Sequence, residues 1–252
     1  MTQENPRTIW SLTGKDAASF LQGLVTNDMR PLEHDPGIVW TALLTPQGKY
    51  LADFFVVRRE AGELLIDIAT PLAADTLRRL TMYRLRADAQ ITPSDLRLSR
   101  GLGTPPVGAL PDPRHPAMGW RLYATDTLAT PDVDWDAIRV ENLIPESGIE
   151  LIPDESYILE TGFERLHGVD FRKGCYVGQE VTARMKHKTE LRKGLVRVRV
   201  EGSAPVGTEI LGADGKAAGT IFTQSGNFAI AYLRHDRSQG MLQASQARLW
   251  LD

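Results

Sequence analysis

The end of the chain, residues 191–252, most constrains what this protein can fold into. After Leu191 the sequence breaks into short apolar segments rich in β-branched residues, separated by turns that contain glycine and aspartate. Short strands at a spacing of about ten residues are typical of small antiparallel barrels. We therefore predict a C-terminal β-barrel over these residues. Its expected strands are Leu195–Val200, Thr208–Leu211, Ala217–Thr223, Phe228–Leu233 and Ala247–Leu251.

The region before residue 191 combines strands and helices. Two apolar runs, Gly37–Thr45 and Tyr50–Arg58, are joined by Pro46–Lys49, where proline and glycine favour a tight turn, so we predict a β-hairpin. A third strand is expected over Leu64–Ala69. Helices are expected over Asp16–Leu24, Pro71–Ala87, Asp134–Arg139 and Ser156–His167. The predicted fold class is α+β, with one α+β region over residues 1–190 and the barrel after it.

Charge and hydropathy exclude two classes of partner. The chain has 29 Lys and Arg against 32 Asp and Glu, a formal net charge of −3 at pH 7. General nucleic-acid binders are basic overall, so we expect no nucleic acid as a partner. Met1–Arg7 contains no apolar core after basic residues, and the longest apolar stretch, around Ile38–Leu44, is too short to span a bilayer. We expect a cytosolic protein with no membrane partner.

Cys175 is the only cysteine of the chain. A single cysteine excludes an intrachain disulfide and any all-cysteine metal site held by one chain, and we predict no resident metal. Cys175 lies in the octapeptide K-G-C-Y-V-G-Q-E, residues 173–180, where the ammonium of Lys173 and a helix expected to begin at Gln179 both favour a thiolate. We therefore take Cys175 as a candidate reactive residue. The alternative is a small buried apolar residue, which lone cysteines often are.

The octapeptide resembles the signature of the YgfZ family of folate-binding proteins, which serve the maturation or repair of iron–sulfur proteins. Three further segments agree in order: Phe20–Asp28, the turn Gly48-Lys49 followed by Asp53, and Asp112–Arg114 followed by Met118–Arg121. That family is similar to the T-protein of the glycine cleavage system, an aminomethyltransferase. The resemblance implies a cloverleaf of α+β subdomains around a central folate cavity, followed by the barrel that the strand pattern predicts independently.

The resemblance also implies tetrahydrofolate, a reduced folate, as the cofactor. A folate site needs an aromatic or apolar slot for the pterin, a hydrogen-bonding partner for its edge, and cations for its glutamate carboxylates. Asp53 is expected to make either a ligand contact or a structural salt bridge, because a carboxylate in an apolar strand needs a partner. The remaining candidates are Lys173, Arg114, Arg121 and Arg184 as cations, and Tyr176 or Trp120 as a ring face.

The sequence departs from the transferase at one pair of residues. The T-protein carries two successive aspartates after the hairpin turn, one of which acts on a folate nitrogen, whereas this chain has Ala52-Asp53. The favoured interpretation is therefore a tetrahydrofolate-binding accessory protein for iron–sulfur assembly or repair. Its catalytic or transiently ligating residue is Cys175, and its partners are assembly proteins or client enzymes. The alternatives are a folate-dependent one-carbon transferase or demethylase, which requires the missing carboxylate, and a binding module without chemistry.

Three further features receive structural interpretations. Tyr83-Arg84-Leu85-Arg86 is expected to present two solvated arginines on a helix. Trp120 and Trp135 are more typical of core residues than of a cofactor stack. The glycines beside Cys175 predict an exposed, bent backbone, so we expect Lys173 to be a surface residue whose truncation leaves the fold intact.

Overall fold

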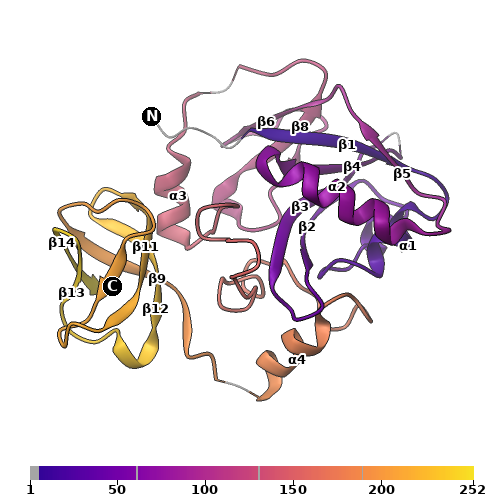
Figure 1. Ribbon diagram of the computed structural model, residues 1–252. Helices are drawn as coiled ribbons and strands as arrows, with labels where there is room; N and C mark the ends of the chain where they lie inside the picture. Colours follow the sequence, from indigo (N-terminus) through magenta and orange to yellow (C-terminus); the bar gives the residue numbers. More distant parts are fainter. Residues whose placement is uncertain (1–5, 61, 130, 189) are drawn as a thin grey trace.

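This computed structural model describes residues 6–60, 62–129, 131–188 and 190–252. Residues 1–5, on which the expected cytosolic location partly rests, lie outside the described residues. An α+β region holds the helices and two sheets, and the barrel lies beside it (Figure 1). No helix of the described chain is both long and apolar enough to cross a membrane.

The largest sheet has five antiparallel strands in the order β2-β3-β4-β1-β5. The predicted hairpin is confirmed, since β2 and β3 pair directly and Trp40 is the register partner of Phe55. The short strand β5 was not predicted. The strands are β1 (Arg7–Thr13), β2 (Gly37–Leu44), β3 (Tyr50–Arg58), β4 (Leu64–Ala69) and β5 (Gln90–Pro93).

Both faces of this sheet are buried, because successive side chains of a strand point to opposite faces. Phe54 packs with the helices α1 (Ala17–Gln22) and α2 (Thr70–Arg84), which cover one face. Phe55 packs on the other face with Trp40, whose ring stacks on Phe163 with the centroids 4.1 Å apart. Near-continuous apolar runs in β3 and β4 match this double burial.

A second sheet has three strands in the order β6-β8-β7: β6 (Arg97–Gly101), β8 (Trp120–Ala124) and the edge strand β7 (Leu110–Pro111). The helix α3 (Trp135–Asn142) begins where the Asp134 side chain accepts a hydrogen bond from the Ala137 N–H, as expected of an N-cap residue. The helix α4 (Gln179–Lys188) precedes the barrel. Three short 3₁₀ turns complete the elements: η1 (Arg30–Leu32), η2 (Pro116–Met118) and η3 (His235–Arg237).

The helix predicted over Ser156–His167 is wrong. The segment forms consecutive turns, and just beyond it the Gly168 N–H donates to the Phe163 carbonyl, five residues earlier. Gly162 has φ 83° and His167 has φ 57°, which a right-handed helix does not allow. Burial, rather than a helical hydrogen-bond ladder, therefore holds this segment. Its buried apolar side chains are Ile158, Leu159, Phe163 and Leu166.

The C-terminal barrel is confirmed as a closed antiparallel barrel in the order β10-β11-β12-β9-β14-β13. The prediction missed β13, which has only three residues. At the junction with α3, the buried carboxylate of Glu150 accepts hydrogen bonds from the N–H and hydroxyl of Thr223 and pairs with Arg139. The strands are β9 (Lys193–Glu201), β10 (Glu209–Leu211), β11 (Ala217–Ser225), β12 (Phe228–Arg234), β13 (Leu242–Ala244) and β14 (Ala247–Leu251).

Candidate functional site

Cys175 is an exposed free thiol in the loop before α4. The helix start predicted at Gln179 is confirmed, and the Gln179 amide oxygen accepts a hydrogen bond from the Tyr176 N–H at 3.3 Å. Exposure contradicts the alternative of a small buried core residue. A reagent or a partner protein can therefore reach this thiol from solvent.

Lys173 is buried, so the expected surface position is wrong. Only 7% of the residue is exposed, and its Nζ donates to the carbonyl oxygens of Gln22 at 2.5 Å and Val25 at 2.6 Å. Burial lowers the pKa of Lys173 to about 8. The side chain therefore fastens the cysteine loop to the C-terminal end of α1, two residues before Cys175.

Gly178 fastens the other end of the loop. This glycine has φ 85°, and a Cβ at this position would lie 2.6 Å from the Thr45 carbonyl oxygen and 3.2 Å from the Cα of Gly48. A Cβ on Gly48 would in turn lie 2.8 Å from the Val181 Cβ. Two glycines thus allow the start of α4 to pack directly on the β2–β3 turn. The exposed thiol sits between this contact and the buried Lys173.

Asp53 is buried on β3, with 4% of the residue exposed. Its carboxylate accepts hydrogen bonds from the Trp40 indole N–H at 2.8 Å and from the hydroxyls of Tyr50 and Ser147, both at 2.6 Å. The expected structural salt bridge is wrong within the described chain, where Asp53 forms no ion pair. Neutral donors satisfy this carboxylate, so it needs no cation and no ligand.

Ala52, the position at which the two functional interpretations differ, lies on the face of the sheet opposite to the Asp53 carboxylate. Its side chain packs among the apolar residues on the α1 and α2 face, whereas the Asp53 carboxylate meets partners on the opposite face. A carboxylate at position 52 would therefore point away from Asp53.

Arg114 and Arg121 are buried within a network of the chain's own carboxylates. Arg121 contacts Asp67 at 2.5 Å and Asp112 at 3.2 Å, and Arg114 forms a two-pronged pair with Asp112. Arg7 completes the network, with its Nε 2.7 Å from Asp67 Oδ1. Burial alone would raise the pKa of Asp67, but the attraction of Arg7 and Arg121 outweighs it and lowers the pKa to about 2. Both predicted cations therefore already have anionic partners inside the protein.

The other predicted binding residues are dispersed. Tyr176 is buried in the core, and the Trp120 indole N–H donates to the Leu102 carbonyl at 3.3 Å. Arg184 is exposed on α4. The structure thus brings Lys173 and Tyr176 together, with Nζ 5.2 Å from the ring centroid, and pairs Arg114 with Arg121 through Asp112, but it does not assemble one site from all candidates.

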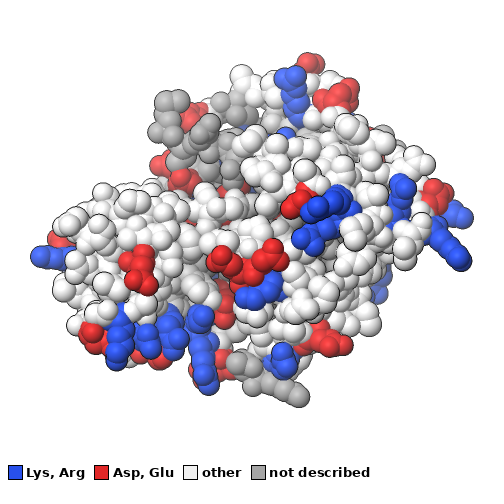
Figure 2. Space-filling view, in the orientation of Figure 1, with Lys and Arg blue, Asp and Glu red and all other residues white. Residues whose placement is uncertain are grey.

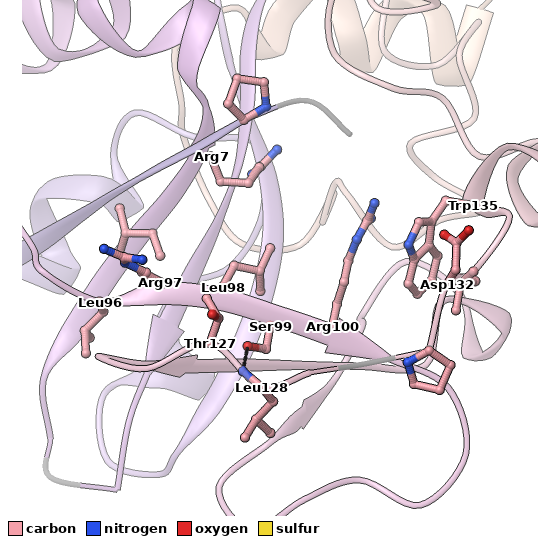
Figure 3. A pocket seen from close by; sticks show the side chains of 14 residues that line it. Arg7, Leu96, Arg97, Leu98, Ser99, Arg100, Thr127, Leu128, Asp132 and Trp135 are labelled. Atoms are coloured by element: carbon pink, nitrogen blue, oxygen red, sulfur yellow. Dashed lines mark hydrogen bonds between the residues drawn. The ribbon is translucent and has the colours of Figure 1, made fainter. Parts of the chain in front are cut away.

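A cavity of about 620 Å³ opens between β1, β6 and the residues that lead into α3. Figure 3 shows Arg100 beside Trp135 at one end and Arg7 across the open space. The Arg100 guanidinium carbon lies 4.2 Å from the centroid of the Trp135 ring, a cation–π contact. Three arginines and one aspartate line the cavity, together with apolar residues. Its volume lies in the range of about 300–1,000 Å³ that is usual for small-molecule sites.

Sequence reasoning missed the arginines of this cavity. Arg7 and Arg100 belong to no motif and lie far apart in the chain, and the fold brings them to one space. Trp135 was predicted to be a core residue; it is buried, and it also forms part of the cavity wall. The only signal in the sequence is that each of these arginines lies at or near the end of a strand, Arg7 in β1 and Arg100 in β6.

The fold and the barrel define a class of protein. The crystal structure of glycine cleavage system aminomethyltransferase T from Bartonella henselae superposes with a TM-score of 0.75, covering 97% of this chain and 82% of that one at 11% sequence identity. Residues 192–251 match the family described as the CAF17 C-terminal β-barrel domain. The chain is thus a protein of aminomethyltransferase-like fold that ends in a CAF17-type barrel.

Sequence comparison gives the family. The chain is 30% identical to the mitochondrial iron–sulfur cluster assembly factor IBA57 of Mus musculus, over 94% of this chain and 78% of that protein. It is 32% identical to the mitochondrial IBA57 homologue of Mycosarcoma maydis, over 75% of this chain and 54% of that protein. The chain belongs to the IBA57/CAF17/YgfZ family. It spans about half the length of the fungal relatives it matches, 54% in Mycosarcoma maydis and 55% in Neurospora crassa.

Proposed function

We propose that this protein supports the assembly or repair of iron–sulfur proteins through the thiol of Cys175. The observation that carries the proposal is an exposed cysteine on a loop held at both ends, by buried Lys173 and by the close packing of Gly178. The names of the relatives, iron–sulfur cluster assembly factors, support the same function.

In this proposal the iron–sulfur cluster is cargo rather than a resident cofactor, and Cys175 is the residue that contacts it. Iron–sulfur clusters are usually held by four cysteine thiolates, and this chain supplies one cysteine. A contact between Cys175 and iron is therefore completed by ligands of an assembly protein or a client enzyme, and it lasts only while that partner is bound. A loop that is already ordered loses little conformational entropy when the partner docks.

We further propose that a reduced folate binds in the cavity lined by Arg7, Arg100 and Trp135. Two features support this ligand: Trp135 and nearby aliphatic side chains provide an apolar wall for the ring system, and three arginines against one aspartate make the lining basic overall, although Arg7 also pairs with Asp67. Arg121 then has a supporting role. It shares Asp67 with Arg7 and so fixes the position of that cavity arginine.

The function is tested by deleting the gene and measuring the activities of several iron–sulfur enzymes in the cells. Complementation with the wild type should restore these activities, whereas Cys175→Ala and Cys175→Ser should not. Arg248→Ala, a change at an exposed residue of the barrel, is the control and should complement. Full activity with Cys175→Ala, at equal protein level, would refute the role of the thiol.

The folate site is tested separately by calorimetric titration with tetrahydrofolate. Arg100→Ala should weaken binding about tenfold, the loss expected for one charge-assisted contact. Arg248→Ala serves again as the control, because Arg248 is exposed and lies outside the described cavity. If Arg248→Ala weakens binding and Arg100→Ala does not, the ligand lies elsewhere.

The compartment is also a proposal. We infer a cytosolic location, as expected above, whereas the relatives named above are mitochondrial proteins. Fractionation of the source cells, with antibody detection of the chain, decides between the two compartments.

A further inference from the structure

The C-terminal end of α2 presents an apolar and basic surface that the proposed function does not use. Residues 78–86 read R-R-L-T-M-Y-R-L-R, with four arginines and no acidic residue. The expected exposure of Arg84 and Arg86 is confirmed, since all residues from 81 to 86 are exposed, but Arg86 lies just beyond the helix, which ends at Arg84. Met82 is 71% exposed, Tyr83 41% and Leu85 89%. We call Met82–Arg86 the α2 end surface.

Leu85 is held in this exposed position by the fold. It has φ 44° and ψ −104°, a backbone conformation that is strained for a leucine. Before Leu85 in the chain, Leu80 is fully buried. After it, the Asp88 N–H donates a hydrogen bond to the Asp16 carboxylate at 2.9 Å. Asp88 also accepts a hydrogen bond from the Asp16 N–H at 3.0 Å. The chain thus presents a large apolar side chain to solvent from a fixed, strained backbone.

The charge of this surface points to the chemistry of its partner. Arg84 and Arg86 form no ion pair with any residue that the structure describes, while Arg78 pairs with Asp75. Figure 2 shows Lys and Arg side chains over the part of the surface where Figure 1 draws α2, on the side of the molecule away from the barrel, with some Asp or Glu side chains beside them. Arginine, methionine and tyrosine are enriched in protein–protein interfaces, and lysine is depleted.

We propose that the α2 end surface docks a partner protein that offers an apolar helix face edged by carboxylates. Leu85 packs on this apolar face, and Arg84 and Arg86 pair with the carboxylates. A membrane is a poorer match, because an interfacial helix needs an apolar face along its length. The apolar face of α2, with Ala73 and Leu80, is already buried against the sheet. This inference does not depend on the proposed function.

Two helix-forming peptides probe the surface. Both peptides carry leucine and phenylalanine on one face. The acidic peptide has glutamates on its other face, and its basic twin has lysines at the same positions. Fluorescence anisotropy with the full chain should show binding of the acidic peptide, weakened by salt, and little binding of the basic twin. The double variant Arg84→Glu/Arg86→Glu should reverse this preference.

Leu85→Gly separates docking from folding. Glycine accepts φ 44° without strain, so the melting temperature should hold within about 2 °C or rise, while affinity for the acidic peptide falls about tenfold. Arg248→Glu, on the barrel, is the control and should leave binding unchanged. The proposal is overturned if Leu85→Gly binds the acidic peptide as tightly as the wild type does. Failure of the acidic peptide to bind, or tighter binding to phosphatidylglycerol vesicles than to the peptide, would overturn it too.

Discussion

Replacing Lys173 with methionine tests whether this residue anchors the cysteine loop. Methionine keeps an unbranched apolar side chain but removes both hydrogen bonds, to the carbonyls of Gln22 and Val25. An unsatisfied buried acceptor costs about 1–3 kcal/mol. The Val25 carbonyl lies in a buried contact, and the Gln22 carbonyl is partly open to water. We therefore expect the free energy of unfolding to fall by about 3 kcal/mol, the full cost of one acceptor and part of the other.

Scanning calorimetry measures this effect directly. For a chain of this size, a loss of about 3 kcal/mol lowers the melting temperature by about 6–12 °C. Lys216→Met is the matched control, because the exposed Lys216 pairs only with the exposed Asp214 among the described residues, and an exposed ion pair contributes little to stability. Hydrogen exchange at residues 174–177 should also become faster in Lys173→Met. If Lys173→Met and Lys216→Met have the same melting temperature, Lys173 does not anchor the cysteine loop.

The remaining predictions concern pH and one buried pair. The pKa of Asp67 is about 2 in the fold against an ordinary 3.8, so its contribution of about 2 kcal/mol is present above pH 4 and is lost as the pH falls toward 2. Acid titration of unfolding should show this loss, and Asp67→Asn should remove it while lowering stability at pH 7. Burial lowers the pKa of Lys173 from 10.5 to about 8, so the unfolded chain binds more protons between these values. The free energy of unfolding of the wild type, relative to that of Lys173→Met, should therefore rise between pH 8 and pH 10.5. If it does not rise, Lys173 is not buried. Arg139→Met leaves the Glu150 carboxylate buried without its cation and should cost about 3–5 kcal/mol, measured by urea unfolding.

Local patterns predicted the fold well where one signal dominates. The β2–β3 hairpin follows from two apolar runs and a Pro–Gly turn, and the barrel from regularly spaced short strands. The turns at 156–167 were mistaken for a helix, because their apolar spacing is helical and only backbone geometry at Gly162 and His167 shows otherwise. Very short strands such as β7 and β13 contain too few residues for a periodic signal, and they are recognised only by their pairing with neighbouring strands.

The candidate site was predictable in one part only. The glycines around Cys175 correctly indicated an exposed, bent loop. Burial of Lys173 was not predictable, because it depends on carbonyls of α1, 148 and 151 residues away in the chain. Arg114 and Arg121 were predicted to face a ligand, yet Arg114 pairs with Asp112, two residues before it, and Arg121 pairs with Asp67 on β4. The contact with Asp67 joins residues far apart in the chain and is found only in the folded protein.

The central claim is that the exposed thiol of Cys175 takes part in delivering iron–sulfur clusters. The most direct measurement is the anaerobic activation of an apo iron–sulfur enzyme by a cluster-loaded assembly protein, with and without this chain. We predict that the wild type increases the rate of activation and that Cys175→Ser, at an unchanged melting temperature, does not. Equal rates with the wild type and Cys175→Ser would contradict the claim.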